Sequence, residues 1–322
     1  MPRLRAGRGP VADGWPVPRR RWSGVTAAAV AAAVAEAMAT EVVAASSVAG
    51  GDVARAYRVE LADGRTVFAK THDHPPPGFF VTEAIGLRWL GEAEAVRVPE
   101  VLAVRDGGGA GGAGTAALLV LEWIAEGSPR PTTEEDFGRA LAGLHRRGAP
   151  CFGRTDRRPT GSRSLPNDPA ATWAEFYAAR RLRPLVALAR HSRALDEGVL
   201  AAIERVADHL DEIGAADEPP ARLHGDLWAG NRLVDRHGVS WLIDPAAHGG
   251  HREFDLAMMR LFGGFGAAAF AAYEEVFPLA EGWPARVPVH QLAPLIVHAV
   301  KFGGGYRAAT ARAVAAIAVS SA

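Results

Sequence analysis

The sequence predicts an α+β fold with two lobes, a small antiparallel sheet followed by a larger, mainly helical part. Three observations support this prediction. The 322 residues exceed the usual length of one domain. Short apolar segments separated by turns, such as 56–61 and 65–70, occupy the chain up to residue 125. Longer segments with helical apolar spacing, such as 172–188 and 199–213, follow.

We therefore divide the chain into a flexible extension (1–22), an amino-terminal lobe (23–125) and a carboxy-terminal lobe (126–322). The extension is rich in Arg, Pro and Gly. The Ala-rich segment 25–40 after it could mimic a secretory signal. However, Glu36 interrupts the apolar run, and Ala is the best helix former, so we expect a helix there.

Composition narrows the possible classes of protein. Hydrophobic residues make up 48% of the chain, and its formal charge is zero, which gives no indication of a nucleic-acid partner. No stretch of 18 or more strongly apolar residues predicts a membrane span. The single cysteine, Cys151, excludes an internal disulfide framework and a cysteine-based zinc site. We expect a reduced, cytoplasmic protein.

The most informative motif is Asp226 with Asn231, followed by Asp244 at the end of a short apolar strand. The catalytic loop of protein kinases has the same interval between its Asp and its Asn, and a later Asp also binds magnesium. The interval from Asn231 to Asp244 fits one tight hairpin with its turn at 236–238. Each residue alone could be an ordinary turn residue. Together they predict phosphoryl transfer, with Asp226 orienting the attacking hydroxyl and Asn231 and Asp244 holding Mg²⁺.

The amino-terminal lobe offers residues for the nucleotide. Lys70 ends the predicted strand 65–70, as the nucleotide lysine does in kinases, and Glu83 in helix 82–90 is its natural ion-pair partner. Gly50 and Gly51 lie between two strands, where backbone N–H groups can approach phosphate closely. An ordinary hairpin turn and a solvated lysine are the alternatives for these residues.

The glycine-rich segment 107–114 precedes a predicted buried strand, 117–124. A dinucleotide-binding fingerprint requires a helix at that point, so we interpret the glycines as a flexible hairpin loop. No GxxxxGK[ST] motif occurs, which excludes a P-loop enzyme. The strand ends with Glu122, Trp123 and Ile124 and runs into 125–129, where a two-lobed kinase has its hinge. We expect exposed backbone groups at this point to bind adenine. Further along, we expect His145 and Asp255 to support the catalytic loop from beneath.

These features resemble the fructosamine (ketosamine) kinases, relatives of the aminoglycoside and choline kinases. The resemblance extends from about residue 25 to residue 310 and rests on the following segments: Gly50-Gly51, 68–70, Glu83, 141–145, 223–231, 243–246, 253–258, 261–265 and 302–306. Trp228 in the catalytic loop and the segment 262–265 resemble ketosamine kinases specifically. The fold implied is that of the protein kinases.

The resemblance implies ATP-dependent phosphorylation of a sugar hydroxyl on a ketosamine, of the ribulosamine, erythrulosamine or fructosamine type. The phosphorylated adduct sheds its sugar, which repairs the protein amine. The resemblance also implies Mg²⁺ and a monomer, and it leaves open whether the substrate is free or protein-bound. Trp228 could stack on this substrate or be an ordinary core residue, and His298 is a second candidate contact.

Two other functions fit the residues. One is a kinase for an aminoglycoside or an amino alcohol, although the carboxy-terminal half is not clearly acidic, as those cationic substrates would favour. The other is a silent nucleotide-binding protein, but such a protein would lack one of Lys70, Asp226, Asn231 or Asp244, and all four are present. His251 and the segment 155–161 depart from the family pattern and leave the identity of the sugar open.

Overall fold

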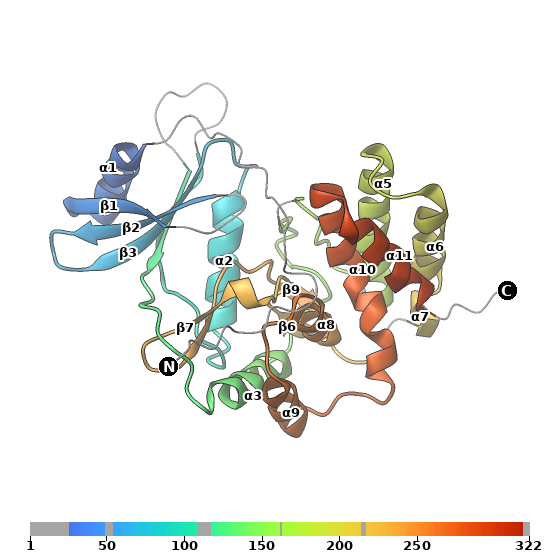
Figure 1. Ribbon diagram of the computed structural model, residues 1–322. Helices are drawn as coiled ribbons and strands as arrows, with labels where there is room; N and C mark the ends of the chain where they lie inside the picture. Colours follow the sequence, from blue (N-terminus) through green and yellow to red (C-terminus); the bar gives the residue numbers. More distant parts are fainter. Residues whose placement is uncertain (1–25, 49–53, 108–116, 162, 214–216, 318–322) are drawn as a thin grey trace, which may run out of the picture.

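The computed structural model describes residues 26–48, 54–107, 117–161, 163–213 and 217–317. It confirms the α+β fold: a sheet with two helices forms one side of the molecule, and most of the helices form the other (Figure 1). The predicted extension 1–22, the Gly50-Gly51 loop and most of the glycine-rich segment lie outside the described residues. The lobe boundary at 125 and 126 stays a prediction.

The sheet of the amino-terminal lobe is antiparallel, with the strand order β1-β2-β3-β5-β4. Its strands are β1 (Val42–Val48), β2 (Arg55–Leu61), β3 (Thr66–His72), β4 (Val101–Arg105) and β5 (Ala117–Glu122). Helices α1 (Ala27–Met38) and α2 (Phe79–Gly91) pack on it. Successive residues of β5 alternate between two cores: Leu118 and Val120 contact α1, while Leu119 and Leu121 contact α2. This period of two assigns the two helices to opposite faces.

The carboxy-terminal lobe is mainly helical. Its helices are α3 (Thr133–Arg146), α4 (Trp173–Tyr177), α5 (Arg183–His191), α6 (Glu197–Asp208), α7 (Leu210–Ile213), α8 (Glu253–Phe262), α9 (Ala267–Val276), α10 (Trp283–Phe302) and α11 (Gly305–Ala315). Helices α3 and α9 pack side by side (Figure 1). Two small antiparallel pairs complete the lobe: β6 (Ala221–Leu223) with β9 (His248–Gly250), and β7 (Arg232–Val234) with β8 (Ser240–Leu242).

The structure corrects some predicted boundaries. The expected helix 172–188 contains one π-helical turn, Ala178–Leu182, between α4 and α5. Helix α10 begins at Trp283 and continues through Pro288 and Pro294, although a proline inside a helix normally interrupts it. The expected strand 117–124 ends at Glu122. Strand β9 was not predicted, since His248–Gly250 lacks the apolar alternation of a strand.

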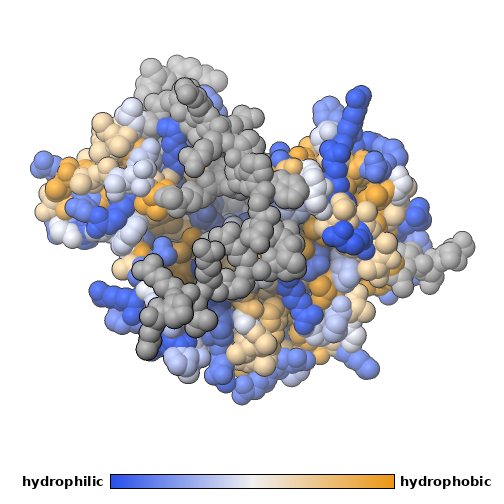
Figure 2. Space-filling model, viewed as in Figure 1, coloured by the Kyte–Doolittle hydropathy of each residue, from blue (hydrophilic) through white to orange (hydrophobic). Residues whose placement is uncertain are grey.

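Surface composition agrees with the balanced charge of the sequence. Figure 2 shows hydrophilic and hydrophobic residues interspersed over the described parts of both lobes on the visible face. Among the described residues, no helix has the length and apolar character required to cross a bilayer.

Candidate active site

The catalytic loop connects β6 to β7 and places Asp226 beside Asn231. The short turn Ala229–Asn231 brings the Asn231 amide back, and its Nδ2 donates to the Asp226 backbone oxygen (2.8 Å) and to Asp226 Oδ2 (3.2 Å). The loop needs glycine at 225, where φ is +80° and an added Cβ would lie 2.3 Å from the Ala246 oxygen. The structure therefore brings Asp226 and Asn231, which the sequence places five residues apart, into direct contact.

Asp255 supports this loop from α8, as expected. Its fully buried carboxylate accepts the backbone N–H groups of His224 (2.8 Å) and Gly225 (2.9 Å). His145 lies beneath it, with Nε2 at 3.3 Å from Asp255 Oδ2 and Nδ1 at 2.8 Å from the Tyr273 hydroxyl. Burial alone would raise the pKa of Asp255, but hydrogen bonds from His145 and the loop backbone lower it. Asp255 thus remains an anion that fixes the loop.

Lys70, Glu83 and Asp244 form a second cluster across the two lobes. Lys70 Nζ lies 2.7 Å from Glu83 Oε1, which confirms the predicted ion pair, and it also contacts Asp244. Burial alone would lower the pKa of Lys70, but the two carboxylates outweigh it and raise the pKa, so the amine stays charged. Asp244 adopts φ of +55°, a conformation that a non-glycine residue rarely takes and that often marks a functional position.

The donor set at Asn231 and Asp244 fits a magnesium ion. Asn231 uses its Nδ2 for Asp226. Its amide oxygen, Oδ1, therefore remains an acceptor without a partner among the described residues. Asp244 pairs with Lys70 through Oδ1 only, which leaves Oδ2. Mg²⁺ prefers one or two such oxygen ligands together with substrate phosphates and water. Side-chain chemistry therefore agrees with the metal roles predicted from the sequence.

The carboxyl group of Asp226 has an unusual acidity for an aspartate. Burial raises its pKa to about 7, and the negative charges of Asp244 and Asp255 act in the same direction. The hydrogen bond from Asn231 and the positive charge of Lys301 oppose the rise. A carboxylate with a pKa near the working pH is suited to accepting a proton from a hydroxyl group.

The residues expected to bind adenine lie at the end of β5 and directly after it. Glu122 Oε2 accepts the N–H of Glu100 (3.2 Å), and the Trp123 ring lies 6.4 Å from that of Phe68. In the part of the chain that the structure describes, the backbone groups of Trp123 and Ile124 make no hydrogen bond, so they are available to a ligand. The chain after them is fixed, because the N–H of Gly127 donates to Val234 of β7 (2.9 Å).

Trp228 and His298, the two candidate substrate contacts, belong to one aromatic wall. Trp228 is 42% exposed, so it is not a core residue, and its ring meets Phe262 edge-on at 6.2 Å. Phe262 contacts His298 at 4.8 Å, and His298 contacts Tyr306 at 4.9 Å. Gly230 permits this arrangement, because a Cβ there would lie 2.2 Å from the Trp228 ring. Trp228, at one end of this wall, lies two residues from Asp226 on the same loop.

Sequence reasoning missed Lys301. It lies in the last turn of α10, one turn after His298, and is close enough to lower the pKa of Asp226. Its ammonium group lies 4.7 Å from the Phe302 ring centre. The signal in the sequence was weak, because a single lysine at a helix end is usually a solvated residue that interacts with the helix dipole.

His251, which departs from the family pattern, is buried beside Glu253 and His290 within the carboxy-terminal lobe.

The fold and the site together define a phosphotransferase of the kinase-like class. In this two-lobed fold, the ion pair of Lys70 and Glu83 lies opposite Asp226, Asn231 and Asp244. Residues 25–319 match the family model described as fructosamine kinase. The chain belongs to the fructosamine kinase family, and membership implies the use of ATP to phosphorylate an acceptor hydroxyl.

Several relatives share most of the chain. A crystal structure from Thermobifida fusca, assigned as a fructosamine-3-kinase, is 43% identical and superposes with a TM-score of 0.80, covering 89% of this chain and 97% of that one. A probable ketoamine kinase of Enterococcus faecium is 36% identical over 80% of this chain and 90% of its own length. A chloroplastic protein-ribulosamine 3-kinase of rice (Oryza sativa subsp. japonica) is 30% identical over 83% and 77%, respectively.

Proposed function

We propose that this protein transfers the γ-phosphoryl group of ATP to a sugar hydroxyl of a ketosamine. One observation carries the proposal: Lys70, Glu83 and Asp244 meet at one point, and Asp226 and Asn231 are joined on the adjoining loop. These five residues come from four separate segments of the chain. Core packing does not require such a gathering of charged and polar groups, whereas phosphoryl transfer does.

Each residue of the cluster has a distinct task. Lys70, held by Glu83, contacts the nucleotide phosphates, and the backbone groups of Trp123 and Ile124, at the end of the strand that contains Glu122, receive the adenine. Asn231 and Asp244 hold Mg²⁺, which neutralises charge on the phosphates when bound. The Gly50-Gly51 loop, whose placement lies outside the described residues, covers the phosphates in this proposal.

Asp226 orients the acceptor hydroxyl and takes its proton. A bond forms between the hydroxyl oxygen and the γ-phosphorus, the bond from that phosphorus to the bridging oxygen breaks, and ADP leaves with the electron pair. Such general-base assistance contributes about 10²–10⁴-fold. The pKa of Asp226, about 7, permits the proton to be accepted near neutral pH and released afterwards.

The aromatic wall favours a ketosamine as the acceptor. Trp228 exposes a flat apolar surface beside Asp226, as stacking on a sugar ring requires, and His298 lies behind it through Phe262. The names of the relatives, ketoamine kinase and protein-ribulosamine 3-kinase, point to the same substrate class. The single cysteine supports a protein that acts in the cytoplasm. The family resemblance supports a monomer that repairs glycated amines.

A substrate panel tests the proposal. Mg²⁺-dependent ADP release would be measured with lysine conjugates of ribulose, erythrulose and fructose, with aminoglycosides and with choline. We expect turnover of one or more ketosamines that disappears in Asp226→Asn. Turnover confined to an aminoglycoside or to choline would replace the ketosamine by a cationic acceptor. Nucleotide binding without turnover of any panel member would indicate a silent nucleotide-binding protein.

A further inference from the structure

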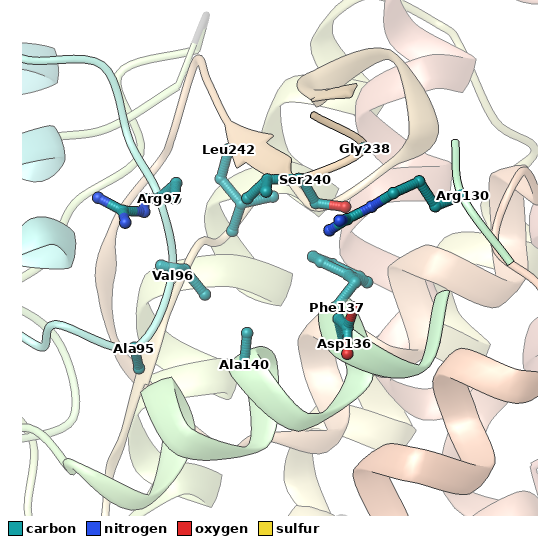
Figure 3. Close-up of a pocket in the computed structure, with 11 residues that line it drawn as sticks. Ala95, Val96, Arg97, Arg130, Asp136, Phe137, Ala140, Gly238, Ser240 and Leu242 are labelled. Carbon is teal, nitrogen blue, oxygen red and sulfur yellow. The ribbon is translucent and has the colours of Figure 1, made fainter. Parts of the chain in front are cut away.

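A pocket of about 170 Å³ lies outside the candidate active site, between the β7–β8 hairpin, the chain that joins α2 to β4, and α3 (Figure 3). None of the candidate catalytic, metal or nucleotide residues lines it. We call it the hairpin pocket. Its apolar surface comes from Val96, Phe137, Ala140 and Leu242, and Arg130 and Ser240 add polar groups to the same space.

The backbone of Arg130 is fixed at this pocket, while its side chain is exposed. Its backbone N–H donates to Thr133 Oγ1 (2.8 Å), and the buried Thr133 hydroxyl donates to the Gly238 oxygen in the hairpin turn (2.6 Å). The stem of Arg130 packs across Gly238, since a Cβ added there would lie 2.6 Å from Arg130 Cγ. The stem of Arg130 is therefore placed beside the pocket, and its exposed guanidinium is a cation that a ligand can reach.

The guanidinium of Arg130 has no protein partner among the described residues, neither a hydrogen bond nor an ion pair. Figure 3 shows it extending towards the middle of the lining residues, while Arg97 lies at the edge. Asp136 also lines the pocket, but its carboxylate already accepts the Thr132 hydroxyl (2.8 Å). Two arginines and one aspartate leave the pocket with one excess positive charge.

Ser240 provides a second unsatisfied group. Its hydroxyl oxygen is buried and makes no hydrogen bond in the part of the chain that the structure describes. A buried hydroxyl without a partner is unfavourable, so such groups are normally bonded to protein, water or a ligand. An acceptor atom in the pocket would satisfy Ser240 and Arg130 at once.

We propose that the hairpin pocket binds a small monocarboxylate that carries an apolar ring or short chain. A planar guanidinium matches a carboxylate through two parallel hydrogen bonds. The apolar surface beside Arg130 would cover the rest of the molecule, and a cavity of about 150 Å³ is known to accommodate one six-membered ring. The single excess charge favours a monoanion over a neutral molecule or a dianion.

The hairpin connects this pocket to the candidate metal ligands. Strand β8 leads directly to Asp244, the N–H of Leu242 donates to the Arg97 oxygen (2.8 Å), and the N–H of Ile243 donates to the Asn231 oxygen (3.0 Å). A ligand between Arg130 and Leu242 would therefore contact the strand that positions both Asn231 and Asp244.

Benzoate is the probe for this site, titrated calorimetrically into the full chain without nucleotide. We expect saturable one-to-one binding with a Kd on the order of 1 mM. Benzamide, the neutral analogue, and the Arg130→Gln variant should each weaken binding at least tenfold. Ser240→Ala should weaken it about threefold, because a neutral hydrogen bond contributes less than a charged one.

Two controls separate this site from others. Arg139→Gln removes an arginine of the neighbouring helix α3 whose guanidinium is already paired with Glu275 (3.1 Å), so benzoate binding should not change. Asp226→Asn should also bind benzoate normally, even though we expect it to lose phosphoryl transfer. Thermal melting would verify that each variant is folded. Equal affinity in wild type and Arg130→Gln, equal affinity for benzamide, or no saturable binding would each overturn the proposal.

Discussion

Replacing Asp226 with asparagine should reduce activity and increase stability at the same time. The substitution keeps the size of the side chain and an oxygen that can accept the Asn231 hydrogen bond (3.2 Å). It removes the group that takes the proton, so kcat should fall about 10²–10⁴-fold. Nucleotide affinity should change little, because Lys70, Glu83 and the hinge remain intact.

The stability change follows from the pKa of Asp226. A folded-state pKa of about 7 against an ordinary value of 3.8 means that the folded protein binds this proton more tightly than the unfolded chain. The contribution of Asp226 to wild-type stability therefore falls between about pH 4 and pH 7 and stays low above it, whereas the side chain of the asparagine variant does not titrate. One pKa unit corresponds to about 1.4 kcal/mol, so the advantage of Asp226→Asn should grow by about 2–3 kcal/mol from pH 5 to pH 8.

Steady-state ADP release and urea unfolding at pH 5 and pH 8, without nucleotide or Mg²⁺ in the unfolding assay, measure the two effects. A purely structural residue would lose stability on substitution, so opposite signs in the two assays identify a functional group. Retained turnover would remove Asp226 from its role as the base. A stability difference that is the same at both pH values would show that its carboxyl group has an ordinary acidity.

Three further predictions concern other parts of the site. Glu83→Gln leaves the buried Lys70 with only Asp244 as its partner, so the protein should lose about 3 kcal/mol of unfolding free energy in urea and bind ATP more weakly; unchanged ATP affinity would contradict the phosphate role of Lys70. Trp228→Ala should raise KM for a ketosamine roughly tenfold and change stability by less than about 1 kcal/mol, because the ring is 42% exposed; an unaltered KM would remove Trp228 from the substrate site. His248 is neutral in the folded protein, since burial lowers its pKa to about 3. Its contribution to the free energy of unfolding is therefore complete above the pKa of the unfolded chain, near 6.5, and is lost as pH falls. The stability deficit of His248→Gln should therefore be about 2 kcal/mol smaller at pH 5 than at pH 7, and a constant deficit in urea unfolding would disprove this titration.

Local sequence patterns were sufficient for much of the fold. Alternating residues in β2 and β3, and helical spacing in α5 and α6, each reflect burial on one face, and the tertiary structure packs these faces into its cores. Local preference is not sufficient where tertiary packing overrides it. Helix α10 retains Pro288 and Pro294 because many of its residues are buried among other helices, which compensates for the missing backbone hydrogen bonds.

The candidate site divides in the same way. Asp226 and Asn231 lie on one loop, so their interval already restricts their geometry, and Asp244 follows across a single hairpin. Lys301 was not predicted, because it reaches the site from the end of α10 and no local motif marks it. Likewise, the orphan hydroxyl of Ser240 depends on how three distant segments meet, which one sequence does not reveal.

The most direct test of the central claim is a crystal structure with Mg²⁺ and a non-hydrolysable ATP analogue. We predict a magnesium ion about 2.0–2.1 Å from Asn231 Oδ1 and from a carboxylate oxygen of Asp244, with Lys70 against the phosphates and Asp226 facing the γ-phosphoryl group. A bound nucleotide whose phosphates lie away from these residues, with no cation between Asn231 and Asp244, would contradict the account.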